Sequence, residues 1–422
     1  MPGVAETRLT GGRPAGAGHA GCPQVDSVSD RGGVQSLPET PAPARRPERR
    51  PGREDRVSHS SQESEAHRWD TAISAVEPQL LYRGYPAEEL ASSQSFLEVA
   101  YLLLTGDLPS DEQLADWQAL LFEGLTLSPA VQSWLRKVPP SATTIDAIHT
   151  ALVRGQLGDE RIVSLSDRDV LDTFPHWLGF VTALATQQPR IAAGNPLVQP
   201  RMELGFAANL LWLWRGREPS PWQERILETC LITAAEHALT PTTLAVRLVA
   251  GGGGDFVAAL TAGISVAQGS GHAGVAGRCL DVLSEVRTPD RADSWVRQRI
   301  SRGESIPGFT HRRYRVGDPR AEWLSPLCLR VAELNDRLDR EDLASAIEQV
   351  VWDQQHLLPA VAWPMARLAD YLEFDRSLFV PLYVISRMAG WAAHFVEQRR
   401  QPPPHPMRLH YTGPALRHLR RD

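Results

Sequence analysis

Three histidines lie in segments of the sequence that favour contact with a ligand. His237 follows a glutamate, His272 is flanked by glycines, and His311 precedes a run of arginines. The glycines beside His272 would let a ligand or another backbone approach the imidazole closely. Arg320 follows His311 by nine residues, so one loop would offer a proton donor and a fork-shaped guanidinium. This pairing suits an anionic substrate that carries a carbonyl group.

Each histidine also has a purely structural explanation. A lone histidine among glycines is more often an ordinary loop residue, and His237, seven residues after Cys230 on a predicted helix, is typical of a core histidine whose hydrogen bonds are satisfied. The sequence has no P-loop, no H-E-x-x-H and no G-x-S-x-G motif. Its four cysteines are widely spaced and form no C-x-x-C pair, so we expect no metal site.

Length and composition indicate a folded protein and exclude several classes of partner. The 422 residues are enough for a large core and about two structural units. A net charge of -6 leaves no basic excess, so we expect neither a nucleic acid nor a membrane surface as partner. No apolar stretch reaches the roughly 18 to 20 residues that span a bilayer, and no secretory signal is recognisable at the start. We therefore predict a cytoplasmic protein.

Apolar spacing beyond the first segment predicts an all-α fold. Residues 1–66 are rich in Gly, Pro, Ala, Ser and Arg, which is typical of a disordered tail. Strand patterns are confined to 71–74 and 80–82. Helical spacing of apolar residues recurs through the rest of the chain, and Ser110 has the character of a helix start. The helices that we expect include 96–104, 222–239, 255–268, 340–351 and 375–398.

Several blocks of sequence occur in an order that one known family shares. They are LYRGYPAEELA (81–91), SFLEVAYLLLTGDLP (95–109), EHALTPTTLAVRLVA (236–250), the segment around His272, PGFTHRRYRVGDPRA (307–321) and ISRMAGWAAHFVEQ (385–398). In these blocks the chain resembles the citrate synthases, including the 2-methylcitrate synthases. The resemblance covers roughly residues 71–413.

The resemblance implies a fold, an assembly and a substrate site. Members of the family are helical homodimers in which a large and a small domain close over the substrates. By analogy the large domain would comprise 67–271 and 381–422, and the small domain 272–380. The family binds oxaloacetate through histidines and arginines that match His237, His311, Arg320 and Arg387. Arginines can clamp carboxylates bidentately, and a histidine can polarise a keto group where negative charge develops.

The resemblance also implies a mechanism and roles for the histidines. In the family an aspartate deprotonates the methyl group of the acyl-CoA, the histidine that matches His272 hydrogen-bonds the forming enol, and the nucleophile attacks the keto carbon. We therefore expect His272 and His311 to be catalytic, and His237, Arg320 and Arg387 to bind substrate. No cofactor is implied beyond the CoA thioester, which is a substrate.

The sequence departs from the family at two functional positions. The family's Asp-Phe-Tyr-Ser-Gly segment aligns without a gap with 362–366, which puts Ala362 at the position of the base. Near the C-terminus the family's first arginine of an Arg-Pro-Arg triplet, which reaches the neighbouring subunit's site, aligns with Pro406. Two carboxylates follow Ala362, those of Asp370 and Asp375, and Asp375 is better explained as a helix N-cap.

Two main functions remain open at this point. The first is an acyltransferase that condenses acetyl-CoA or propionyl-CoA with oxaloacetate or a similar 2-oxo acid to a citrate-type product and CoA. The alternative is a catalytically impaired paralogue that acts as a binding or regulatory subunit of an active citrate synthase, in a heteromer rather than a homodimer. A third reading, hydrolysis or cleavage of a citryl-type thioester, has no residue that specifically favours it.

Overall fold

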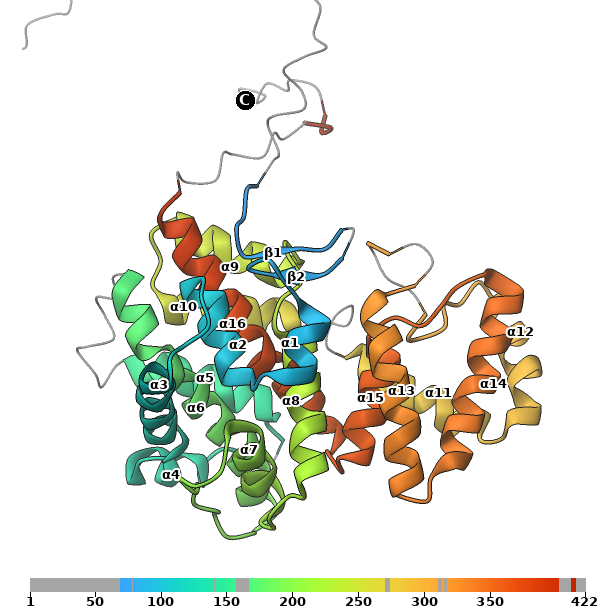
Figure 1. Cartoon of the computed structure of the whole chain (residues 1–422), viewed down its shortest axis with the longest axis horizontal. Coiled ribbons are helices and arrows are strands. Elements are labelled where there is room, and N and C mark those ends of the chain that lie inside the picture. Colours follow the sequence, from blue (N-terminus) through green and yellow to red (C-terminus); the bar gives the residue numbers. More distant parts are fainter. Residues whose placement is uncertain are drawn as a thin grey trace, which may run out of the picture. The chain divides into compact units, whose positions relative to one another are not determined.

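The computed structural model describes residues 69–77, 79–139, 141–156, 167–269, 274–309, 313–314, 317–401 and 411–414. The predicted tail, residues 1–66, lies outside the described residues, as do His272 and His311. Figure 1 shows the helices and a small sheet of the described part.

The described residues are mainly helical, which confirms the all-α prediction. In chain order the elements are β1 (Ser74–Ala75), β2 (Leu81–Tyr82), β3 (Tyr85–Pro86), α1 (Ala87–Ser93), α2 (Phe96–Thr105), α3 (Asp111–Leu125), α4 (Pro129–Leu135), α5 (Thr144–Gln156), α6 (Asp167–Ala192), α7 (Phe206–Arg215), α8 (Pro221–Ala235), α9 (Pro241–Gly251), α10 (Phe256–Ala267), α11 (Val275–Val286), the 3-10 turn η2 (Pro289–Arg291), α12 (Ala292–Ser301), α13 (Pro319–Leu334), α14 (Leu338–Gln355), α15 (Ala362–Tyr371), the 3-10 turn η3 (Arg376–Leu378) and α16 (Phe379–Arg399).

Helix starts follow from local hydrogen bonding. The Ser95 side chain accepts from the backbone N–H of Glu98, whose carboxylate accepts from the N–H of Ser95, and this reciprocal pair caps α2. Ser110 and Gln113 form the same arrangement at α3, so the predicted start at Ser110 is confirmed. The Asp255 side chain caps α10 by accepting from Ala258 N–H.

A three-stranded antiparallel sheet, in the order β1-β2-β3, lies before the first helix. Arg83 and Gly84 join β2 to β3 with φ of 49° and 92°, and positive φ at both central residues is typical of a tight hairpin turn. The Tyr82 hydroxyl lies 2.9 Å from the carbonyl oxygen of Glu236 and 3.0 Å from that of Ile232. The sheet is therefore fastened to the end of α8.

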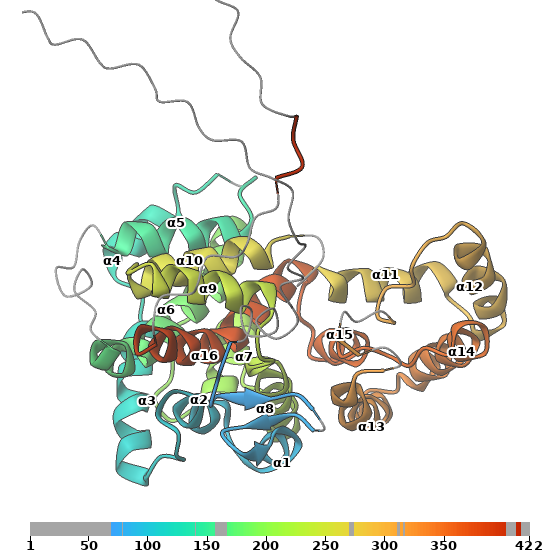
Figure 2. The same cartoon turned by 90° about the horizontal axis from the view of Figure 1, so that it is seen from above.

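Helix α16 is the centre of the helical packing. It contacts α2, α6, α8, α9 and α10, and Figures 1 and 2 both show it running among them. Trp391 and Phe395 are fully buried, and apolar residues occur all round the helix, as expected for an element enclosed by others. Among the described residues, no helix combines the length and apolarity that a bilayer crossing requires.

Helices α11 to α15 form a second group that packs on itself. Helix α15 contacts α11 and α13, while α14 contacts α12 and α13. Inside this group Arg367 is buried and pairs with Glu341 at 2.7 Å, and the Tyr371 hydroxyl donates to the same carboxylate at 2.7 Å. The predicted domain boundaries at 272 and 380 stay a prediction, because residues 270–273 lie outside the described part.

Two glycines let α3 and α6 approach each other closely. A Cβ added to Gly124 would lie 2.0 Å from the carbonyl oxygen of His176, and one added to Gly179 would lie 2.3 Å from that of Leu121. Real Cβ atoms do not come this close to backbone oxygens, so the spacing of the two helices depends on both glycines.

We expect Gly179→Ala to lower the melting temperature, because the methyl group would force α3 and α6 apart at a cost of about 1–3 kcal/mol. Gly277→Ala in α11 is the matched control, because a Cβ there meets nothing within 4 Å and alanine is the better helix former. Thermal unfolding followed by circular dichroism would measure both. Equal melting temperatures for the two variants would contradict the close approach.

Candidate active site

His237 lies in a turn between α8 and α9, not on a helix. The predicted helix 222–239 ends at Ala235, and Glu236 is extended with φ of -148°. Ala238 has a φ of 52°, and Thr240 caps α9 ahead of Pro241. The residue before a proline disfavours the helical conformation, and the proline is well placed at the first position of a new helix. The sequence prediction was wrong here because apolar residues continue to Leu239, whereas the helix already ends at Ala235, ahead of the turn that leads to Pro241.

The imidazole of His237 is held against a phenol. Its Nε2 lies 2.9 Å from the Tyr314 hydroxyl, and the two rings meet edge to face with centroids 5.5 Å apart. His237 is buried, while Tyr314 is partly buried and burial raises the pKa of its hydroxyl. Tyr314 comes three residues after His311 in the sequence, and His311 itself lies outside the described residues.

Arg320 is buried at the start of α13, where Asp318 is the N-cap. Its Nε and Nη2 donate to the two carboxylate oxygens of Asp318 at 3.0 and 2.8 Å. Burial lowers the pKa of Arg320, but Asp318 together with Tyr82 and Tyr314 raises it overall, so the guanidinium stays charged. A buried cation with a two-point partner is thus built into the first turn of the helix.

The same carboxylate links the start of α13 to the segment before Ala362. Asp318 also accepts from the N–H of Val361 at 3.3 Å, and its own N–H donates to the carbonyl of Pro359. A second link runs from Ala360 N–H to the carbonyl of Gly308 at 2.7 Å. Residues on both sides of 310–312 therefore lie beside the start of α15, although His311 itself is outside the described residues.

Arg387 is buried on α16 and faces the turn that carries His237. Its Nη2 donates to the hydroxyls of Thr240 and Thr243 at 3.3 and 3.2 Å, and lies 3.8 Å from Oε2 of Glu236. The Nε of Arg387 is buried without a hydrogen-bond partner among the described residues. An unmade hydrogen bond on a buried guanidinium is the kind of donor that an anionic ligand satisfies.

Arg320 and Arg387 both affect the pKa of the Tyr82 hydroxyl, so both guanidiniums lie near this phenol. Burial raises the pKa of the Tyr82 hydroxyl, whereas the guanidiniums of Arg320 and Arg387 both lower it. Both cations therefore act on the same phenol, which contacts the backbone of Glu236. The structure thus places Arg320 and Arg387 near Tyr82 and near the turn that carries His237, while the substrate-binding roles of His237, Arg320 and Arg387 stay a prediction.

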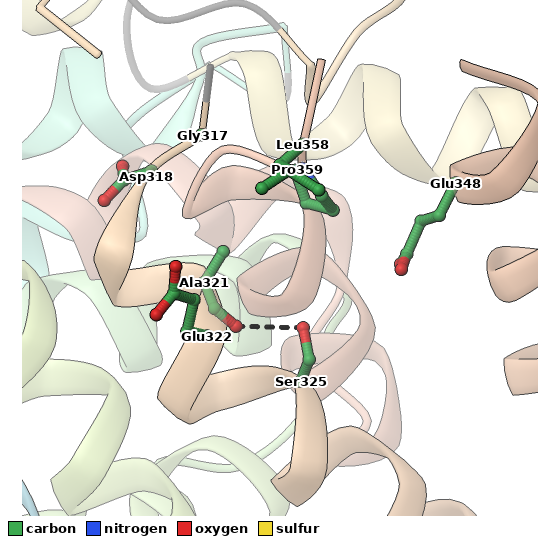
Figure 3. A pocket seen from close by; sticks show the side chains of 8 residues that line it. All are labelled: Gly317, Asp318, Ala321, Glu322, Ser325, Glu348, Leu358 and Pro359. Carbon is green, nitrogen blue, oxygen red and sulfur yellow. Dashed lines mark hydrogen bonds between the residues drawn. The ribbon is translucent and has the colours of Figure 1, made fainter. Parts of the chain in front are cut away.

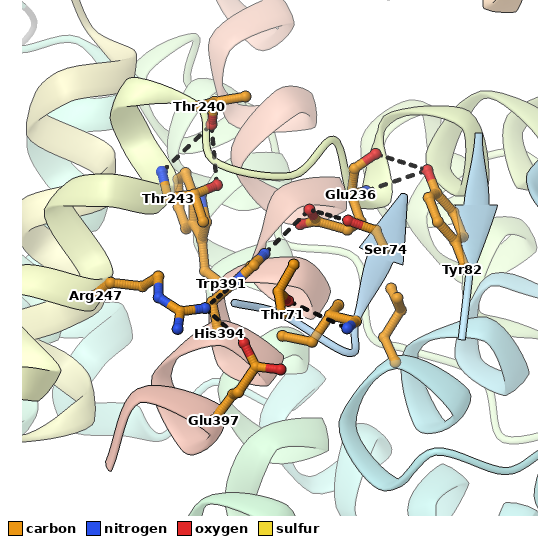
Figure 4. Close-up of polar contacts among 12 residues, drawn as sticks. Thr71, Ser74, Tyr82, Glu236, Thr240, Thr243, Arg247, Trp391, His394 and Glu397 are labelled. Atoms are coloured by element: carbon orange, nitrogen blue, oxygen red, sulfur yellow. Dashed lines mark hydrogen bonds and ion pairs between the residues drawn. The ribbon is translucent and has the colours of Figure 1, made fainter. Parts of the chain in front are cut away.

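A buried polar chain behind this site was not foreseen from the sequence (Figure 4). Glu236 Oε1 accepts from Ser74 Oγ at 3.0 Å and lies 3.1 Å from Nε2 of His394. His394 Nδ1 lies 2.8 Å from Nη1 of Arg247, which also pairs with Glu397 at 2.6 Å. Burial alone would raise the pKa of Glu236, but His394 and Arg387 lower it to about 2. The spacing of three between His394 and Glu397 places them on one helix face, but the sequence does not reveal their partners.

Ala362 is the first residue of α15 and is partly buried against the core. The two carboxylates that follow it are engaged elsewhere: Asp370 pairs with Arg340, and Asp375 accepts from Ser377 N–H at 2.8 Å as the cap of η3. The predicted capping role of Asp375 is confirmed. Neither carboxylate is available to take the place of a base at Ala362. Pro406 lies outside the described residues.

A small hollow opens beside Asp318, between α13, α14 and the turn at Leu358 and Pro359 (Figure 3). Its volume is about 100 Å³, and the charged residues that line it are Asp318, Glu322 and Glu348. Three carboxylates do not suit an anionic substrate. Among the described residues, no group of three or more His, Cys, Asp or Glu side chains is placed to hold a metal ion.

We expect Asp318→Asn to destabilise the protein by about 3–5 kcal/mol, because it leaves the buried guanidinium of Arg320 without its counter-charge. Urea unfolding would measure the change. The matched control is Asp293→Asn, which breaks an exposed pair with Arg297 and is expected to cost less than about 1 kcal/mol. A similar loss for both variants would show that the Asp318 pair is not structurally important.

Comparison with known proteins identifies the family to which the chain belongs. The model named "Citrate synthase, C-terminal domain" matches residues 66–408. The chain is 31% identical over 334 residues to a citrate synthase of Mycolicibacterium smegmatis, which covers 78% of this chain and 88% of that relative. It is 31% identical over 337 residues to a 2-methylcitrate synthase of Mycobacterium tuberculosis, covering 78% and 84%.

A solved structure agrees with these relatives. The crystal structure of citrate synthase from Pyrobaculum aerophilum matches with a TM-score of 0.76 at 28% identity and covers 84% of this chain and 92% of that chain. The helical fold, the residues matched by the family model and the sequence relatives all agree. This chain belongs to the citrate synthase family.

Proposed function

We propose that the protein is an acyltransferase that condenses an acyl-CoA with oxaloacetate or a similar 2-oxo acid, giving a citrate-type product and CoA. The observation that carries this proposal is the pair of buried guanidiniums, Arg320 and Arg387, that act on one phenol beside His237. The relatives with 31% identity are a citrate synthase and a 2-methylcitrate synthase. These names fit acetyl-CoA and propionyl-CoA as the acyl donors.

The charge of the site suits the oxo acid. Oxaloacetate carries two carboxylates, and each can accept two parallel hydrogen bonds from a guanidinium. A histidine beside them can donate to the keto oxygen, on which negative charge develops during attack. We assign substrate binding to His237, Arg320 and Arg387, and catalysis to His272 and His311. The reaction needs no cofactor beyond the CoA thioester substrate.

The position of the base supports the alternative function, a catalytically impaired subunit that binds the oxo acid and regulates an active partner. By alignment with the family the base would be at Ala362, whose methyl group cannot accept a proton. Asp370 and Asp375 already have other partners. Removal of a general base typically lowers the rate by about 10²- to 10⁴-fold, so positioning by the remaining residues supports slow turnover.

Oxaloacetate-dependent release of CoA thiol from acetyl-CoA and propionyl-CoA tests both functions. We expect Ala362→Asp to raise the rate by about 10²- to 10⁴-fold, because it restores a carboxylate at the base position. Ala362→Asn is the matched control, since it has the same shape without a basic oxygen, and it should not raise the rate.

The outcomes separate the two readings. Fast turnover by the wild-type protein, with no gain in Ala362→Asp, would mean that another group supplies the base. Absent turnover in the wild type, with activity in Ala362→Asp, would favour the regulatory subunit. Absent turnover in all variants would overturn the acyltransferase proposal.

We also propose a homodimer, formed through α9. Leu248 on this helix is 41% exposed, and Leu244 and Val249 are only partly buried, although α10 and α16 pack on the same helix. A partly uncovered apolar helix in a protein with a homodimeric family architecture fits a second copy of the chain. A heteromer with an active paralogue would use the same surface.

We expect Leu248→Glu to shift the molar mass in solution from dimer to monomer, because a charge would be buried in the interface. Light scattering coupled to size-exclusion chromatography would measure it. Leu329→Glu, at an exposed leucine of α13, is the matched control and should leave the mass unchanged. If Leu248→Glu stays dimeric, the interface lies elsewhere.

We propose a cytoplasmic location. The support is the free thiols of Cys230, Cys279 and Cys328, which suit a reducing compartment, and the bacterial source of the two 31% identical relatives named above.

A further inference from the structure

Arg387 is a buried cation whose hydrogen bonds are few and long. Its side chain is 2% exposed, and its contacts to Ala234, Thr240 and Thr243 measure 3.2 to 3.5 Å. Its Nε has no partner among the described residues. Strong charge-assisted bonds are shorter, near 2.7 to 2.9 Å. Neutral contacts of this kind do not by themselves fix the direction in which the guanidinium points.

Glu236 supplies the countercharge to this guanidinium. Its Oε2 lies 3.8 Å from Nη2 of Arg387 and has no hydrogen-bond partner among the described residues. Its Oε1 is fixed by Ser74 and His394. One oxygen thus anchors the carboxylate, and the other faces the arginine as a charge. Since the carboxylate is fully buried, little solvent screens this attraction.

The anchor of Glu236 is itself rigid. Arginine can only donate hydrogen bonds, so Arg247 donates to Nδ1 of His394, and Nε2 of His394 must carry the proton that it donates to Glu236. Arg247 is held in turn by Glu397 and by Gln398 at 2.9 Å. The orientation of Glu236 is therefore set by side chains of α9 and α16 that do not line the site.

Gly390 makes room for this geometry. A Cβ at Gly390 would lie 2.2 Å from Oε2 of Glu236 and 2.5 Å from the carbonyl oxygen of Ala235. Gly390 follows Arg387 by three residues, one turn along the same face of α16. The helix that carries the arginine is thus shaped to admit the carboxylate next to it.

We infer that Glu236 is a positioning residue: through the ion pair with Arg387 it sets the direction of the guanidinium and thereby the affinity of the site for a carboxylate of the 2-oxo acid. This inference rests on the proposed function. When the acid binds, Nε of Arg387 can donate to it, because this atom has no other hydrogen-bond partner among the described residues, while Glu236 holds its charge beside Nη2.

Glu236→Gln changes this arrangement with little change in shape. The carbonyl oxygen of the glutamine must take the place of Oε1, because the N–H of His394 needs an acceptor there. The amide nitrogen then takes the place of Oε2 and points N–H groups at the N–H groups of Arg387. Donor facing donor is unfavourable, so the guanidinium turns away and the carboxylate contact is lost.

Isothermal titration of the full chain with oxaloacetate, and separately with acetyl-CoA, tests the inference. We expect Glu236→Gln to weaken oxaloacetate binding by about tenfold or more and to leave acetyl-CoA binding unchanged. Glu236→Asp keeps the charge on a shorter side chain and should restore part of the affinity. Glu341→Gln is the matched control, because it also removes the carboxylate of a buried Glu–Arg pair, with Arg367, but in α14 and α15.

Each outcome decides a different point. Wild-type affinity for oxaloacetate in Glu236→Gln, or tighter binding, would overturn the positioning role while leaving the proposed function intact. Equal weakening for oxaloacetate and acetyl-CoA, or equal weakening in Glu341→Gln, would show a general loss of structure and overturn the role as well. A wild-type protein that binds no oxaloacetate would overturn the proposed function, and the inference with it.

Discussion

Burying two guanidiniums in a helical core is the constraint on which the site depends. A buried charge is costly unless it is paired, and the protein meets this cost separately for each cation. Asp318 binds Arg320 with both oxygens, whereas Glu236 faces Arg387 at 3.8 Å without a hydrogen bond. In the first pair both carboxylate oxygens of Asp318 already accept from Arg320, so the pair is mainly structural. The second leaves donors unused, which makes Arg387 the guanidinium with more capacity for a ligand.

Both ion pairs lie at helix ends, and this position explains why their side chains can be buried and still contact residues of neighbouring elements. Asp318 caps α13, and Glu236 follows the last residue of α8. Helix ends leave backbone groups unpaired, so side chains and turns gather there to satisfy them. The result at α8 is a short turn in which Glu236 points inward to α16 while the next residue, His237, meets Tyr314. One turn therefore carries both Glu236 and His237, the residue to which we assign substrate binding.

Local signals in the sequence predicted most of the elements but not their partners. Apolar spacing and capping residues identified α2, α10 and the start of α3, because these depend on neighbours within a few positions. His237 and Arg320 were first singled out by their neighbours in the sequence, whereas Arg387 and the substrate-binding roles of all three came from the family resemblance. The contact between Glu236 and His394 could not be predicted, because these residues lie 158 positions apart and the contact leaves no periodic pattern in the sequence. The end of α8 was missed because apolar residues continue to Leu239, although the helix ends at Ala235.

The buried polar contacts of Glu236 also imply an order in which these parts of the protein become compact during synthesis. Ser74 leaves the ribosome first, Glu236 follows, and the residues of α16 that neutralise or fix it come last. Until residues 387–397 emerge, Glu236 has neither His394 nor Arg387, and the cost of burying its charge keeps the end of α8 open to water. Contacts between distant segments form slowly because a long loop must close first. We therefore expect the surroundings of Glu236 and Arg387 to be among the last parts of the chain to become compact, and a nascent protein that stalls before α16 to leave the end of α8 exposed.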